Sequence, residues 1–232
     1  MARIRPNAPP MRDGVGASCV VLPSGPWPNL LAFLCARFPS VARAEWERRL
    51  DSGNVVDDQG QTASAADPVQ LGRRLYYYRS MAAEPHIPFE AQIVWQDAHL
   101  LVVDKPHFLP VMPSGKYVQE TLLVRLKQQL GLEGLTPIHR IDRDTAGLVL
   151  FSTNPASRNA YHALFRDRQV AKIYECIAPW NPDLHWPQHR QSRIAESAHF
   201  LQQTEVEGPV NAITDIAPLE ILGEWARYQL RP

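Results

Sequence analysis

The sequence predicts an α+β fold in which a mixed, mainly antiparallel sheet is flanked by helices and preceded by a small α/β module. Short strand patterns alternate with helical patterns, without the strict β-α rhythm of a parallel sheet. The 232 residues suffice for one medium domain or two small ones, and hydrophobic residues make up 45% of them, which suits a packed core. No internal repeat is evident.

Changes in composition along the chain predict three regions. Residues 1–24 are rich in Pro, Gly and Arg and have no apolar period, which predicts a flexible N-terminal arm. Residues 25–84 carry two helical patterns followed by a small β-turn-β pattern. The two prolines in Glu84–Pro88 interrupt regular structure and mark a linker, so the main domain is expected over residues 85–232.

The small module begins with two short helices. The first carries the leucines of Leu30–Leu34, and the second is expected to begin at Ser40 as N-cap and to run to Leu50. A turn at Asp57–Gly60 then follows a short valine strand. The aromatic run Leu75–Arg79 favours a strand, which either buries alternate faces or offers rings on which bases could stack.

The main domain begins with strands at Ile93–Trp95 and Leu100–Val103, joined by a turn. Apolar residues at helical spacing predict a helix over Leu122–Leu130 that ends at Gly131, a residue suited to left-handed backbone. An uninterrupted apolar run then predicts a strand at Gly147–Ser152.

The last elements alternate again between helix and strand. Asn154 is a typical N-cap for a helix, followed by a strand at Ala171–Ala178. The stripe that this helix is expected to bury comprises Tyr161, Leu164 and Phe165. Residues 180–195 have no period and predict an irregular loop, and strand patterns return at 212–214 and 219–222.

Charge is balanced overall, with 24 basic and 24 acidic residues. A protein that binds nucleic acid by bulk electrostatics normally has a basic excess, so any RNA contact here must come from a local cluster. Such an excess lies between residues 140 and 172, where six Arg or Lys residues face three Asp residues. These charges are either part of a binding site or ordinary solvated side chains.

The remaining composition excludes several classes of protein. The three cysteines are far apart and form no C-x-x-C pair, and the eight histidines show no metal-ligand spacing, so neither a disulfide nor a metal site is expected. No apolar run long enough for a membrane span and no signal peptide is present, which predicts a cytoplasmic protein without membrane contact.

Asp142 is the strongest candidate for a catalytic residue. It lies between Arg140 and Arg143, immediately before the strand predicted at Gly147–Ser152. Flanking guanidinium groups are expected to keep the carboxylate ionised and in place.

Three segments in the same order resemble motifs of the RluA-like family of RNA pseudouridine synthases. His139–Phe151 is similar to the pattern H-R-L-D-x-x-T-S-G-L-L-L, with Ile141 and Ala146 as mild departures. Phe165–Tyr174 is similar to F-x-x-R-x-V-x-K-x-Y. Upstream, Leu101–Val111 resembles the family's V-x-K-P-x-G-x-x-V opening, although Phe stands at position 108, where Gly is common. The resemblance covers about residues 90 to 232.

This resemblance implies an enzyme that isomerises a uridine to pseudouridine in ribosomal RNA, transfer RNA or both, without a cofactor. It implies that Asp142 is the catalytic aspartate, that Arg140 enters the RNA stack in place of the turned-out base, and that Tyr174 lies beside the flipped uracil. Contacts with RNA phosphates are expected from four basic residues in these segments, His139, Arg143, Arg166 and Lys172. A monomer is expected.

The two ends of the chain carry weaker resemblances. Residues 25–84 are similar to the S4-like RNA-binding module that often precedes this catalytic domain, and a helical cap without an RNA role is the alternative. Tyr228–Pro232 is similar to the family strand Y-x-L-x-P, which leads into T-G-R-x-H-Q-L-R. The catalytic domain is therefore expected to be incomplete at its C-terminus.

Two other functions remain as alternatives. A non-catalytic RNA-binding protein, or an inactive truncated synthase, would keep the Asp142 loop without turnover. A glycoside hydrolase would use paired carboxylates such as Asp142 and Asp144, but residues two apart on an extended segment point to opposite faces and cannot easily flank one bond.

Overall fold

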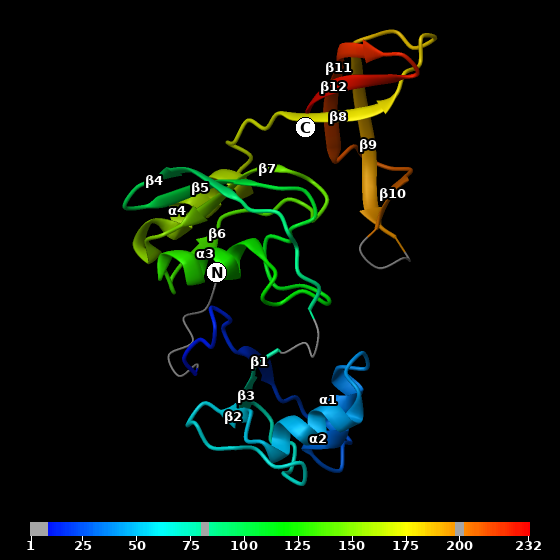
Figure 1. Ribbon diagram of the computed structural model, residues 1–232. Coiled ribbons are helices and arrows are strands. Elements are labelled where there is room, and N and C mark those ends of the chain that lie inside the picture. Colours follow the sequence, from blue (N-terminus) through cyan, green and yellow to red (C-terminus); the bar gives the residue numbers. More distant parts are fainter. Residues whose placement is uncertain (1–8, 80–83, 198–201) are drawn as a thin grey trace. The chain divides into compact units, whose positions relative to one another are not determined.

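The computed structural model describes residues 9–79, 84–197 and 202–232 and divides the chain into two compact units, Met1–Ala163 and Leu164–Pro232 (Figure 1). Every strand pair among these residues is antiparallel, so the predicted α+β fold with a mainly antiparallel sheet is confirmed. The boundary between these units, after Ala163, differs from the predicted domain boundary near residue 84. The predicted domain boundary stays a prediction.

The N-terminal module is a three-stranded sheet of order β1-β3-β2 covered by two helices. Its elements are β1 (Ser18–Val21), α1 (Leu30–Arg37), α2 (Arg43–Asp51), β2 (Val55–Asp57) and β3 (Arg74–Tyr77). Trp46 lies at the centre of its core, with its ring 5.1 Å from that of Tyr77. Tyr76 and Tyr77 are both buried, so the aromatic run is a structural strand.

Two predictions for this part of the chain are wrong. Residues 18–21, expected in a flexible arm, pair with β3, because Val20 and the adjacent Leu22 complete the module's core; residues 1–8 lie outside the described part. Helix α2 begins at Arg43 with Ala42 as N-cap and no side-chain cap, so Ser40 does not cap it. Helix α1, in contrast, is capped by Asn29, whose side chain accepts a hydrogen bond from Ala32.

The second part of the first unit is a four-stranded sheet of order β4-β5-β7-β6 with helix α3 packed on it. Its elements are β4 (Gln92–Gln96), β5 (Leu100–Lys105), α3 (Leu122–Leu130), β6 (Thr136–Pro137), β7 (Gly147–Ser152) and α4 (Pro155–Arg166). The predicted helix end at Gly131 is confirmed by its left-handed φ of 65°, and Asn154 caps the last helix as expected by accepting from Ala156. The stripe expected on α4 is wrong, because none of its residues is buried.

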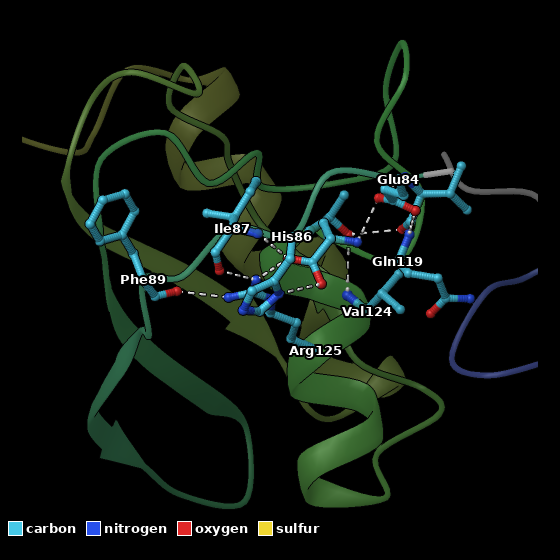
Figure 2. Close-up of polar contacts among 10 residues, drawn as sticks. Glu84, His86, Ile87, Phe89, Gln119, Val124 and Arg125 are labelled. Atoms are coloured by element: carbon cyan, nitrogen blue, oxygen red, sulfur yellow. Dashed lines mark hydrogen bonds and ion pairs between the residues drawn. The ribbon is translucent and has the colours of Figure 1, made fainter. Parts of the chain in front are cut away.

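Segment 84–89 is not a free linker, because polar contacts hold it against the start of α3 (Figure 2). The carboxylate of Glu84 accepts hydrogen bonds from the backbone N–H groups of Val118, Gln119 and Glu120 at 2.6–2.9 Å. The guanidinium of Arg125 donates to the carbonyl oxygens of Ile87 and Phe89. The proline signal indicated a break in regular structure, but these tertiary contacts decide its rigidity.

The second unit contains a five-stranded sheet of order β10-β9-β11-β12-β8. Its strands are β8 (Tyr174–Pro179), β9 (Gln188–Glu196), β10 (Gln203–Val206), β11 (Ala212–Leu222) and β12 (Trp225–Arg231). The irregular loop expected over 180–195 is wrong for its second half, which is β9. That strand is polar on both faces, so it lacks the alternation by which a half-buried strand is recognised.

Candidate active-site loop

The loop that carries Asp142 connects β6 to β7 and lies at the end of the sheet where β5 stops and β7 starts. The last residue of β5, Lys105, lies opposite the first residue of β7, Gly147. The backbone N–H of Ile138 donates to Leu150 at 2.8 Å, and Nε2 of His139 accepts from the N–H of the same residue at 3.2 Å. These bonds anchor the start of the loop to the middle of β7.

The carboxylate of Asp142 is exposed and is not paired with the arginine that follows it. Arg143 instead donates to Asp144, with 2.7 Å between Nε and Oδ1, and this bond lowers the pKa of the Asp144 carboxyl. The expectation that Arg143 holds Asp142 is therefore wrong, because in this turn, which the Thr145 N–H closes on the carbonyl of Asp142, the guanidinium of Arg143 pairs with Asp144. Arg140 is exposed and forms no ion pair with any residue that the structure describes.

A buried lysine lies beneath this loop. Lys105 continues the alternation of Leu101 and Val103 along β5, so its side chain points to the core face of the sheet and is fully buried. Its ammonium donates to the carbonyl oxygens of Pro106 at 2.9 Å and Arg143 at 3.0 Å. The second bond ties the Asp142 loop directly to β5.

Burial lowers the pKa of Lys105 to about 8, although the charges of Asp144 and Asp142 act in the opposite direction. A lysine with this pKa beside a candidate catalytic carboxylate is a further candidate functional residue, which the sequence did not predict. The available signal was the alternation of β5, which places position 105 on the apolar face.

The segment after Lys105 has an unusual backbone. Phe108 has a φ of 66°, in the left-handed region that a bulky residue rarely adopts, and its ring is half exposed. A glycine enters this region without steric cost, which explains why Gly is common at this position of the motif. The neighbouring His107 donates from Nδ1 to the carbonyl of Asp144 at 2.7 Å, giving the loop a second tie.

Comparison with known proteins identifies the family. Residues 99–228 match the family model described as RNA pseudouridylate synthase, which is more than half of the chain. The chain belongs to the RNA pseudouridylate synthase family.

Two curated relatives illustrate the match. An uncharacterized RNA pseudouridine synthase of Synechocystis is 34% identical over 148 residues, which cover 64% of this chain and 50% of the relative. The ribosomal large subunit pseudouridine synthase D of Pseudomonas aeruginosa is 29% identical over 147 residues, covering 60% and 46%. The chain therefore spans about half the length of these relatives.

A solved structure supports the fold. Human RNA pseudouridylate synthase domain containing 1 aligns with a TM-score of 0.50 at 18% identity, covering 65% of this chain and 62% of the human chain. The α+β architecture is therefore shared with a pseudouridylate synthase domain.

The predicted site residues fall in both compact units. His139, Arg140, Asp142 and Arg143 share the loop of the first unit. In the second unit, Tyr174 is the half-buried first residue of β8, opposite Leu230 of β12, so this strand begins three residues later than expected. Lys172 is exposed, and Arg166 is exposed and bonded to Asp167 at 2.9 Å.

Two kinds of feature are absent from the described residues. No helix in that part of the chain is long and apolar enough to cross a membrane. No group of three or more His, Cys, Asp or Glu side chains within it could hold a metal ion.

Proposed function

We propose that this chain isomerises a uridine to pseudouridine in structured RNA and that Asp142 is the catalytic carboxylate. The observation that carries the proposal is an exposed Asp142, without an ion pair to any described residue, on a loop that Lys105 and His139 anchor to the sheet. The fixed loop positions the carboxylate, and exposure leaves its oxygen atoms accessible to a substrate. Family membership supplies the reaction.

The reaction rearranges one nucleotide without any co-reactant. The N1–C1′ bond breaks, the base turns, a bond forms between C1′ and C5, and the proton lost from C5 is balanced by one gained at N1. An ionised Asp142 assists either by attacking C1′ or by promoting a glycal, and neither route requires a metal or redox cofactor. The proposed enzyme therefore acts without a cofactor, and we propose that it is a cytoplasmic monomer.

The other site residues hold RNA in this proposal. Arg140 is exposed and free of ion pairs to other described residues, so its guanidinium can stack on bases in the space that the flipped nucleotide leaves. Tyr174 stacks on the uracil and relays a proton at C5. Arg143 and Arg166 are in exposed ion pairs, which are weak enough to exchange for phosphate, and Lys172 and His139 add phosphate contacts.

The test is tritium release from RNA labelled with [5-³H]uridine, comparing the unaltered chain with Asp142→Asn and the matched control Asp144→Asn. Asp142→Asn removes the reacting oxygen with little change of shape, so release should stop while RNA binding persists. Asp144→Asn should retain release. Release by the Asp142→Asn variant would contradict the proposal.

The same assay separates the alternatives. RNA binding without release by the unaltered chain would favour a non-catalytic RNA-binding protein. Separate substrate pools of ribosomal and transfer RNA would show which class is modified. Ribosomal RNA is one candidate because a relative is named for the large ribosomal subunit.

A further inference from the structure

A cleft rich in arginine lies in the first compact unit, and no residue of the Asp142 loop lines it. Its volume is about 430 Å³. The N-terminal segment, the end of α2, the residues that follow β3 and the segment before α3 form its walls. The charged residues that line it are Arg12, Asp13, Arg48, Arg49, Arg79 and Glu84, and we call this site the arginine cleft.

The two carboxylates of the arginine cleft do not neutralise its four guanidinium groups. Those carboxylates are Asp13 and Glu84, and the oxygen atoms of Glu84 accept from three backbone N–H groups (Figure 2). Arg48 and Arg49 share one acid, Glu45, at 2.8 and 2.7 Å. The net charge of the groups in and around the cleft is therefore positive, although the formal net charge of the chain is zero.

Arg12 and Arg79 are held in place by neutral groups alone. Arg12 donates to the side-chain oxygen of Asn54 at 2.9 Å and lies 4.3 Å from the ring centre of Tyr78. Arg79 donates to the carbonyl oxygens of Pro113 and Gly115 at 3.4 and 3.2 Å. Neither forms an ion pair within the described ranges. Neutral acceptors orient a guanidinium without cancelling its charge, and each keeps free N–H donors.

The N-terminal segment contributes to this site because it is fixed. The hydroxyl of Tyr78 donates to the carbonyl of Pro10, and Val15 packs against Val118 and Val124 in a small apolar cluster. These contacts hold Arg12, which precedes the cluster by three residues. The segment expected to be a flexible arm therefore supplies one wall of the cleft.

We propose that the arginine cleft binds backbone phosphates of the RNA substrate, at a site separate from the Asp142 loop. The proposal rests on the proposed function for the identity of the anion. Guanidinium groups match phosphate oxygens in pairs, and a cleft with four of them extends beyond a single phosphate. Arg12 covers the ring of Tyr78, the one aromatic side chain of the lining, so base stacking there is blocked and phosphate contacts, which position RNA without reading its sequence, are expected.

The experiment measures binding of unfractionated transfer RNA to the full 232-residue chain at several salt concentrations. The test variant is Arg12→Gln/Arg79→Gln. The control is Arg37→Gln/Arg43→Gln, which removes the same charge from helices α1 and α2 at positions that do not line the cleft. Circular dichroism and the unfolding temperature verify that both variants fold, and Arg12→Lys/Arg79→Lys serves as a milder pair should the first not fold.

Loss of two phosphate contacts should reduce the slope of log K against log salt by about 1.4 to 1.8, the values for single strands and for duplex, and should weaken binding roughly 25- to 60-fold at 0.1 M salt by lost counterion release. The control should match the unaltered chain. The Arg12→Lys/Arg79→Lys variant keeps both charges, so the slope of log K against log salt should stay the same. It loses the paired guanidinium donors, so binding should be weaker. An unchanged slope in the glutamine variant would overturn the proposal. If only the lysine variant folds, unchanged affinity in that variant would overturn it.

Two further outcomes keep the proposals apart. Competition by polyglutamate as effective as by RNA would assign the cleft to acidic peptides instead and overturn the proposal. If tritium release depends on Asp142 but the cleft variants bind RNA like the unaltered chain, only the proposal for the arginine cleft is refuted. A reduced slope in a chain that never releases tritium would support the cleft and refute the proposed function.

Discussion

The buried ammonium of Lys105 predicts an unusual dependence of stability on pH. Its pKa is lowered from 10.5 to about 8 in the folded protein because burial disfavours the charge. Between pH 8 and 10.5 the unfolded chain still holds a proton that the folded chain has lost, so the free energy of unfolding rises with pH. The slope approaches 1.4 kcal/mol per pH unit, and the total gain is roughly 3 kcal/mol. Below pH 8 both states are protonated and this contribution is flat.

Replacing Lys105 by Met keeps the length of the side chain and removes its charge. At pH 7 the change relieves roughly 3 kcal/mol of burial cost but leaves the carbonyls of Pro106 and Arg143 without their donor, at about 1–3 kcal/mol each. These terms are of similar size and opposite sign. The stability at one pH is therefore a poor test, and the difference between the two pH curves is a sharp one.

The assay is urea unfolding of both proteins from pH 7 to pH 10.5, with Lys116→Met as an exposed-lysine control. The unaltered protein should gain roughly 3 kcal/mol over Lys105→Met across this range. Groups common to both proteins, such as Tyr77, whose pKa burial raises, cancel in the difference. Parallel curves would refute the reasoning, because they would mean that Lys105 titrates alike in the folded and unfolded chains.

Three further predictions follow from the same region. Lys105→Met should slow tritium release while leaving RNA affinity unchanged, because it frees the Asp142 loop from β5; equal rates would show that the tie does not matter. At position 108, Phe108→Val should be about 1–2 kcal/mol less stable to urea than Phe108→Gly, because a left-handed backbone penalises a β-branched residue, and the reverse order would contradict the observed φ. Thr121→Ala removes the N-cap bond to Val124 of α3 and should lower the free energy of unfolding by about 1 kcal/mol, whereas a thermal melt unchanged from the parent would count against the cap.

Local signals in the sequence located most elements of the first unit correctly. The apolar run Gly147–Ser152, the Asn154 cap and Gly131 were each predicted from a few adjacent residues, and each occurs as predicted. These features depend on the backbone preferences of single residues and on the pattern of apolar residues, which are properties of a short segment. Each motif that indicated the family is likewise a short segment.

Features that depend on distant partners could not be predicted in this way. Strand β9 is recognisable only by its pairing with β10 and β11, and β1 only by its pairing with β3. The ion pair of Arg143 was assigned to the wrong aspartate, because sequence proximity does not determine which side chain a turn brings within 2.7 Å.

The sequence alone determined the family resemblance, the α+β class and the position of Asp142 shortly before a strand, because motifs and periodicity are written in consecutive residues. Only the tertiary structure showed that Lys105 is buried and bonded to the Asp142 loop, and that Arg12 and Arg79 line one cleft. The members of each pair lie more than 35 residues apart in the chain. Burial, pKa and convergence of charge arise from contacts between such segments, so they exist only once the chain has folded.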